Sequence, residues 1–128
     1  MENKIYILDS NVFIWFFYED DSLHDLSLKI LEELKSSKII VPYCVIQEVC
    51  SIFSIRFWKQ IADNFLYFLL ETDNFELINN DVYDEVSHFL EFKDKISFTD
   101  LSLIMISKKY WAELITFDKQ LLKLYWNS

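Results

Sequence analysis

Four short runs of β-branched, aromatic and other apolar residues recur along this 128-residue chain, and segments with helical periodicity separate them. A strand buried on both faces appears as such a continuous apolar run, whereas a helix shows apolar residues every three or four positions. Strands that alternate with helices form parallel sheets, because each return to the same edge needs a long crossover. The predicted strands are residues 4–8, 38–41, 75–78 and 113–116.

The segments between the strands carry helix signals. Ser22 with Asp25 forms a capping-box-like start, and Pro42 suits the first turn of a helix. The predicted helices are 10–18 (ended by EDDS), 22–35, one from Pro42, one or two across 52–70, 81–92, 97–110, and one from Asp118. We therefore expect a single α/β domain over residues 1–128, a three-layer sandwich with a central parallel sheet of four or five strands.

The composition, 52% hydrophobic and 18% aromatic, excludes a disordered chain. No apolar run approaches the roughly 18–20 residues of a membrane span, and no targeting segment is recognisable, so we expect a cytoplasmic protein. Cys44 and Cys50 lack the spacing of a zinc site or of a pair facing one another on a helix, which predicts reduced thiols. His24 and His88 lie in charged helical contexts and are expected to be solvated.

Four acidic residues follow or close apolar runs in which a carboxylate has no packing role. Asp9 follows the first predicted strand, and Glu48 lies in the helix after the second. Asp100 opens the 97–110 helix, and Asp118 follows the fourth strand. The fold could bring them together, because ligands of parallel sheets bind at the carboxyl ends of the strands. Carboxylates gathered without Lys or Arg would repel one another, which implies a divalent cation and metal-dependent phosphodiester chemistry.

Each acid also has a structural interpretation. Asp9 and Asp118 could simply cap the helices that follow them, and Asp100 could be the partner of a Ser97 cap. Glu48 by itself would be read as part of a solvated helix face. Capping does not explain why such residues stand at several strand ends.

Two threonines accompany the acids. Thr99 precedes Asp100, and Thr116 closes the strand before Asp118. A hydroxyl in such a place can orient a carboxylate or a metal-bound water, so both are candidate supporting residues. All other acidic residues, the 19–21 run included, are interpreted as solvated surface.

These segments resemble PIN domains, and specifically the VapC-type ribonuclease toxins of bacterial and archaeal toxin–antitoxin pairs. The matching stretches are ILDSNV at 7–12, VPY at 41–43, VIQEV at 45–49, SFTD at 97–100 and LITFD at 114–118. The resemblance extends over residues 5–125. It implies a parallel sheet between helices and an acidic cluster that binds Mg²⁺ or Mn²⁺. The cluster maps onto Asp9, Glu48, Asp100 and Asp118, with Asn11 and Thr116 lining the site.

The resemblance also implies a homodimer that a cognate antitoxin holds inactive and that cleaves RNA at selected sites. Asp9, Asp100 and Asp118 would hold one ion, and Glu48 a second ion or a metal-bound water. Two ions about 3.5–4 Å apart would activate a water and stabilise the leaving oxygen, without a catalytic histidine.

The net charge of −9 argues against a general nucleic-acid binder, which would show a basic face. It favours a structured RNA such as a tRNA over nonspecific binding. Solubility is the simpler explanation for each lysine in the chain that could contact such an RNA. These candidates are Lys93, Lys95, Lys108, Lys109, Lys119 and Lys123.

Three further features bear on the resemblance. A glycine that the family commonly has between the sixth helix and the fourth strand is absent, and KYWA stands at 109–112. Because few residues follow Asp118, we expect the last edge strand of the family to be absent. The aromatic-rich region 53–68 exceeds what a small core readily buries, which makes it a candidate surface for a dimer partner or an antitoxin helix.

Other functions stay open. A receiver domain needs an acidic pair after the first strand and a Lys near the end of the last, where this chain has Asp-Ser-Asn and Thr-Phe-Asp. A haloacid-type phosphatase needs an acid at position 11, which is Asn11. A PIN-like domain that only binds protein, and a nuclease that cuts DNA, are the nearer alternatives.

Overall fold

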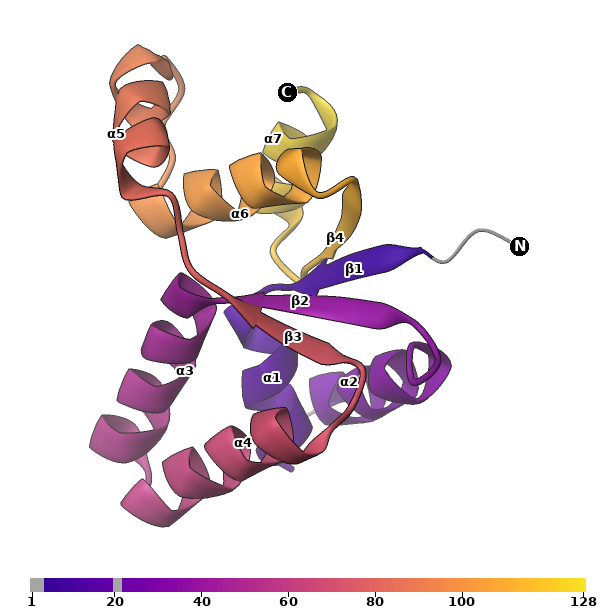
Figure 1. Ribbon diagram of the computed structural model, residues 1–128. Helices are drawn as coiled ribbons and strands as arrows, with labels where there is room; N and C mark the ends of the chain where they lie inside the picture. The colour runs from indigo at the N-terminus through magenta and orange to yellow at the C-terminus, as the bar shows by residue number, and fades with distance from the viewer. Residues whose placement is uncertain (1–3, 20–21) are drawn as a thin grey trace.

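A computed structural model describes residues 4–19 and 22–128, and in this part of the chain four strands and seven helices alternate (Figure 1). The sheet lies between helices α1 to α4 on one side and α5 to α7 on the other, which confirms the predicted three-layer α/β sandwich. The elements are β1 (Ile5–Leu8), α1 (Ser10–Phe17), α2 (Ser22–Glu33), β2 (Lys38–Pro42), α3 (Tyr43–Arg56), α4 (Lys59–Glu71), β3 (Phe75–Ile78), α5 (Val82–Glu91), α6 (Phe98–Lys109), β4 (Ala112–Ile115) and α7 (Lys119–Trp126).

All strand pairs in the described sheet are parallel, and the strand order is β3-β2-β1-β4. The chain therefore adds β2 and β3 on one side of β1 and then returns to place β4 on the other. The register pairs Leu8 with Ile115, the last residues of β1 and β4. The order of strands reverses between β1 and β4, and open parallel sheets bind ligands at such a point.

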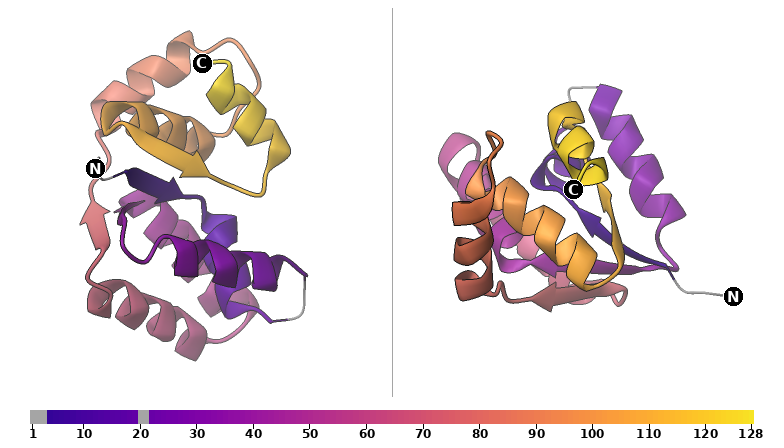
Figure 2. Two further views of the ribbon diagram at one scale, coloured as in Figure 1. Left: turned by 90° about the vertical axis from the view of Figure 1, so that its right-hand side faces the viewer. Right: turned by 90° about the horizontal axis from the view of Figure 1, so that it is seen from above.

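The apolar runs become strands because helices cover both faces of the sheet. Ile7, Leu8, Ile39 and Ile40 have no exposed surface. Figure 2 shows α6 and α7 on the same face of the sheet, with α5 standing beside α6 at the rim. In the described part of the chain, no helix is both long and apolar enough to span a membrane.

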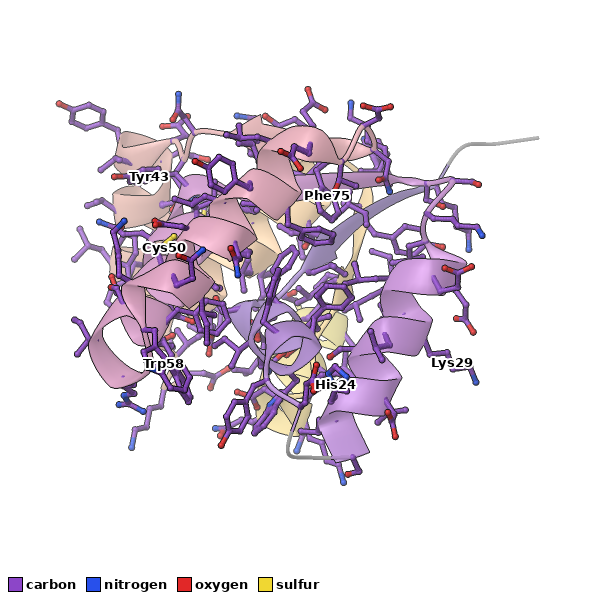
Figure 3. The ribbon with its side chains drawn as sticks, turned by 90° about the horizontal axis from the view of Figure 1, so that it is seen from below. His24, Lys29, Tyr43, Cys50, Trp58 and Phe75 are labelled. Carbon is purple, nitrogen blue, oxygen red and sulfur yellow. The ribbon has the colours of Figure 1, made fainter. Side chains whose placement is uncertain are left out.

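A cluster of aromatic rings fills the space below the sheet between α1, α3 and α4. The ring of Phe65 lies 5.4 Å from that of Phe13 and 6.0 Å from that of Phe17, both edge-on. Phe75 extends the cluster at the start of β3, where its ring is 5.2 Å from that of Phe68 (Figure 3). Edge-to-face pairs of this kind add about 0.5–1.5 kcal/mol each beyond the area that they bury.

This cluster corrects the prediction for the aromatic region 53–68. Phe53 and Phe65 are fully buried, and Phe57 and Phe68 are half-buried against the core. Only Trp58 and Tyr67 among its aromatic residues are exposed, at 65% and 60%. The core absorbs most of the region because the rings of α1 stack against it from the sheet side.

Smaller differences from the sequence analysis have local causes. Pro42 ends β2 and caps α3 instead of opening its first turn, since its extended ψ of 153° continues the strand. His24 is half-buried, with Nδ1 2.9 Å from the carbonyl oxygen of Trp15, whereas the sequence predicted a solvated side chain.

Both cysteines are free, as expected. Residues 1–3, 20 and 21 lie outside the described residues, so the EDDS turn and the N-terminal boundary of the domain stay predictions.

Trp111 occupies the connection between α6 and β4 where the family resemblance places a glycine. Its φ of 56° is in the left-handed region, and its side chain is 91% exposed. A residue with a Cβ pays about 1–2 kcal/mol for this conformation, and burial of the ring offsets none of that cost here.

We predict that Trp111→Gly raises the free energy of unfolding by about 1 kcal/mol, because glycine adopts this φ without steric cost. The measurement is urea denaturation followed by circular dichroism. Trp111→Ala is the matched control, because it removes the ring but keeps a Cβ, and it should change stability by less than about 0.5 kcal/mol. Equal effects of the two substitutions on stability would show that the positive φ of residue 111 does not cause the change.

Candidate active site

Asp9 lies at the end of β1 and caps α1. Its Oδ1 accepts a hydrogen bond from the Ser10 backbone N–H at 2.7 Å, and its Oδ2 accepts one from the Thr116 hydroxyl at 2.7 Å. The residue is only 7% exposed. The carboxylate is thus held at the carboxyl edge of the sheet with both oxygens in fixed directions.

The Thr116 hydroxyl connects the ends of β1 and β4. Besides donating to Asp9, its Oγ1 accepts the Asp118 backbone N–H at 3.0 Å and lies 3.3 Å from Nδ2 of Asn11, which donates to it. Asn11 also accepts the Phe117 N–H through Oδ1 at 3.3 Å. These bonds place Asn11 and Thr116 beside Asp9, the arrangement that the resemblance implies.

The remaining acids lie on three helices around this point. Asp100 is half-buried in the first turn of α6, where its backbone N–H donates to Ser97 Oγ at 3.1 Å. Asp118 is exposed and caps α7, because its Oδ1 accepts the N–H groups of Gln120 at 2.9 Å and Leu121 at 3.1 Å. Glu48 is half-buried on α3.

The four acids are close enough to influence one another's ionisation. Burial raises the pKa of Asp9 to about 6, the hydrogen bonds from Thr116 and Ser10 oppose this, and repulsion by Asp100 and Glu48 adds to it. Burial also raises the pKa of Asp100, with repulsion from Asp118 and Glu48, while the hydrogen bond to Ser97 lowers it. Two of the four carboxylates therefore resist ionisation in the absence of a cation.

The donor set fits a hard divalent cation. Carboxylate oxygens are the ligands that Mg²⁺ and Mn²⁺ prefer, and such ions keep several waters. As the described side chains stand, no three or more His, Cys, Asp or Glu residues are grouped so that they could hold a metal ion. Burial is the main cause of the raised pKa values of Asp9 and Asp100, and a cation would relieve the smaller contribution that comes from repulsion between the acids.

Thr99 and the candidate lysines, which the sequence analysis proposed for the site, contribute less to it than the four acids do. Thr99 is half-buried in the first turn of α6, and no hydrogen bond joins it to a carboxylate of the site within residues 4–19 and 22–128. Of the candidate lysines, Lys95 lines a cavity beside Asp100 and Asp118. Lys108 instead donates to the backbone oxygen of Ser128 at 2.6 Å.

Glu85 is a buried acid that the sequence analysis misplaced on the solvated surface. It is 3% exposed, its two carboxylate oxygens accept Nδ2 of Asn80 at 3.0 and 3.1 Å, and Oε1 also accepts the Ser102 hydroxyl. Asn80 in turn accepts the backbone N–H of Cys44 at 3.2 Å. No described Lys, Arg or His forms a salt bridge with Glu85.

This network joins the two helices that carry Glu48 and Asp100. Cys44 lies in the first turn of α3, and Ser102 lies on α6 two residues after Asp100. The sequence gives no reliable signal for the burial of Glu85, because Val82, Val86 and Phe89, its apolar neighbours at helical spacing, are themselves 60%, 40% and 36% exposed.

Comparisons with known proteins place these observations in context. The family model for the PIN domain matches residues 6–127. A comparison with curated proteins finds no match. Among solved structures, the chain is similar to Mycobacterium tuberculosis VapC20, described as a sarcin–ricin loop cleaving toxin, with a TM-score of 0.79 and 16% identity over 94% of this chain and 95% of that one. At this identity the likeness extends to the fold alone.

We predict that the free energy of unfolding of the metal-free protein falls as the pH rises from about 4 to about 6. Asp9 keeps its proton up to a pKa of about 6 when folded, against an ordinary value of 3.8, so the folded state binds more protons in this window. The loss reaches about 3 kcal/mol, since each pKa unit corresponds to about 1.4 kcal/mol.

The measurement is urea denaturation between pH 4 and pH 7 with EDTA present. Asp9→Asn should flatten the slope, and Asp73→Asn, an exposed control far from the site, should keep it. An identical slope in Asp9→Asn and wild type would show that another group causes the pH dependence.

We predict that Glu85→Ala lowers the free energy of unfolding by about 3 kcal/mol, because the Ser102 hydroxyl and the Asn80 amide lose their acceptor inside the protein. Glu85→Gln keeps one acceptor oxygen and should cost less. Glu91→Ala, exposed on the same helix, is the control and should stay within about 0.5 kcal/mol of wild type. Denaturation midpoints of the three variants provide the comparison, and equal values for Glu85→Ala and Glu91→Ala would contradict the network's role.

Proposed function

Because this chain belongs to the PIN domain family, we propose that it is a divalent-metal-dependent endoribonuclease and the toxin of a toxin–antitoxin pair. The observation that carries the proposal is the gathering of Asp9, Glu48, Asp100 and Asp118 at one edge of the sheet, with repulsion between them that a cation would relieve. Such a site, at the strand-order reversal, suits phosphodiester hydrolysis.

In this proposal Asp9, Asp100 and Asp118 hold Mg²⁺ or Mn²⁺, and Glu48 holds a second ion or a water on the first. When bound, the metal supplies a nucleophilic water at neutral pH and stabilises charge on the leaving oxygen. Thr116 keeps the Asp9 carboxylate in one orientation through its 2.7 Å hydrogen bond.

Helix N-termini help to hold the acids in place. Asp9 and Asp118 cap α1 and α7, and Asp100 lies in the first turn of α6. The partial positive charge of a helix N-terminus favours a carboxylate there by about 0.3–1 kcal/mol. These contributions stabilise the ionised carboxylates that a metal requires, although burial opposes ionisation.

We propose a structured RNA as the substrate and the cytoplasm as the place of action. The net charge of −9 disfavours affinity that depends on many phosphate contacts. VapC20, described as a toxin that cleaves the sarcin–ricin loop, is a structural neighbour with a substrate of this kind. A tRNA is the other structured candidate.

The proposed protein partners are a cognate antitoxin and a second copy of the chain. Exposed apolar residues on α3 and α4 support a partner surface there: Ile55, Trp58, Tyr67 and Leu70 are each at least 60% exposed. A cationic segment of an antitoxin that enters the acidic site would displace the metal and inhibit the enzyme directly. A PIN-like module that only binds protein is the alternative.

We predict that purified, antitoxin-free protein cleaves RNA from a panel of tRNAs and ribosomal RNA fragments with Mn²⁺ or Mg²⁺ but not with EDTA. Asp100→Asn should reduce the rate at least about 100-fold, because the metal contributes several kcal/mol to the transition state. Asp73→Asn should cleave like wild type.

Equal cleavage by wild type and Asp100→Asn would indicate a contaminating nuclease or a different site. A folded wild-type protein that cleaves no RNA and binds no Mn²⁺ in calorimetry would favour the protein-binding module. Metal-dependent cleavage of DNA but not RNA would revise the substrate.

A further inference from the structure

A cavity of about 420 Å³ opens beside the acidic site, between the start of α6 and the start of α7. Asp100 and Asp118 form part of its wall, whereas Asp9 and Glu48 do not line it. The cavity therefore lies on the side of the acidic site that Asp100 and Asp118 form. Its volume lies within the roughly 300–1,000 Å³ of small-molecule sites.

The remaining wall of the cavity is mixed in character. Ile96 and Leu124 are half-buried and supply an apolar surface, whereas Leu121 also lines the cavity but is only 1% exposed and adds almost no surface. Lys95 and Gln120 are exposed polar residues at the same cavity. An apolar surface with a few polar groups is the combination that holds a planar ring and pairs with its edge.

The charge of the chain limits how RNA can be held at this site. Proteins that depend on phosphate contacts carry clusters of Lys and Arg, but this chain has a net charge of −9. Lys95 is the one lysine that lines the cavity, and no salt bridge engages it among residues 4–19 and 22–128. Affinity must then come largely from contacts to a base and from the metal.

We propose that this cavity binds the unstacked base of the nucleotide next to the cleaved phosphodiester, with Gln120 as the residue that determines base preference. The inference rests on the proposed ribonuclease function. Ile96 and Leu124 contact the ring, and the Gln120 amide, which has a donor and an acceptor, pairs with its edge. Lys95 contacts a neighbouring phosphate, and the substrate must present an unpaired nucleotide at the cleavage site.

The first test compares cleavage by Leu124→Trp, which fills the cavity, with that by Leu26→Trp, an exposed control on α2. The substrates are short RNAs randomised at the nucleotides that flank the cleavage site found for wild type. Leu124→Trp should raise KM at least about 10-fold and lose base preference, since an apolar pocket contributes about that factor. Its affinity for Mn²⁺ should be unchanged, as measured by calorimetry.

The second variant, Gln120→Leu, changes an exposed residue and guards against a folding defect in Leu124→Trp. We expect the ratio of kcat/KM between the preferred base and the others to fall about 10-fold or more, as for loss of a paired hydrogen bond to a base. Lys95→Gln should reduce the slope of log affinity against log salt by about 0.7, the value for one phosphate contact to a single strand.

A binding experiment separates failure of this inference from failure of the proposed function. Methyl NMR spectra of wild type are recorded with each of the four ribonucleoside 5′-monophosphates in the presence of Mg²⁺. Shifts confined to the methyl groups of Ile96, Leu121 and Leu124 would support the pocket even if no RNA were cleaved. Absence of such shifts, or cleavage by Leu124→Trp with wild-type rate and base preference, would overturn it.

Discussion

Strand β1 hydrogen-bonds to β2 on one side and to β4 on the other, and this central position controls where the polar residues meet. Leu8 and Ile115 end side by side, so that Asp9 and Thr116 follow at the same edge and bond to each other at 2.7 Å. The helices that start or pass at this edge bring Asp100, Asp118 and Glu48 close to Asp9 or to one another. Asp9 and Thr116, which are 107 positions apart in sequence, thereby form a direct hydrogen bond.

A group of carboxylates without cations is costly to assemble, and the structure reduces the cost in two ways. Backbone N–H groups at the first turns of α1 and α7 donate to Asp9 and Asp118. The Thr116 hydroxyl also donates to Asp9, and the Ser97 hydroxyl accepts the backbone N–H of Asp100. The pKa values of Asp9 and Asp100 are nevertheless raised, mainly by burial and to a smaller extent by repulsion from the neighbouring acids. This repulsion supports the proposal that the acids bind a metal ion.

The fold could be predicted because local signals were sufficient for it, whereas the role of the four acids as a metal site stays a prediction. Each strand is a continuous apolar run, and an Asp at a strand end has both a capping and a functional reason to be there. Glu85 could not be placed in the same way, since its burial depends on Asn80 and Ser102, which only tertiary packing brings to it. The aromatic region was misjudged because a sequence does not show which rings of α1 will cover Phe53 and Phe65.

The hydrogen bonds to Asp118 also bear on which ion the proposed metal site would select. Oδ1 of Asp118 is already engaged by two backbone N–H groups, so this carboxylate offers its other oxygen more freely to a metal, whereas both oxygens of Asp9 accept hydrogen bonds. Binding through single oxygens suits the compact octahedral shell of Mg²⁺ or Mn²⁺. Ca²⁺ instead takes six to eight ligands and often uses both oxygens of a carboxylate. In the proposed site, the backbone N–H groups that engage Asp118 would thus leave this carboxylate to bind through one oxygen and would favour Mg²⁺ or Mn²⁺ over Ca²⁺.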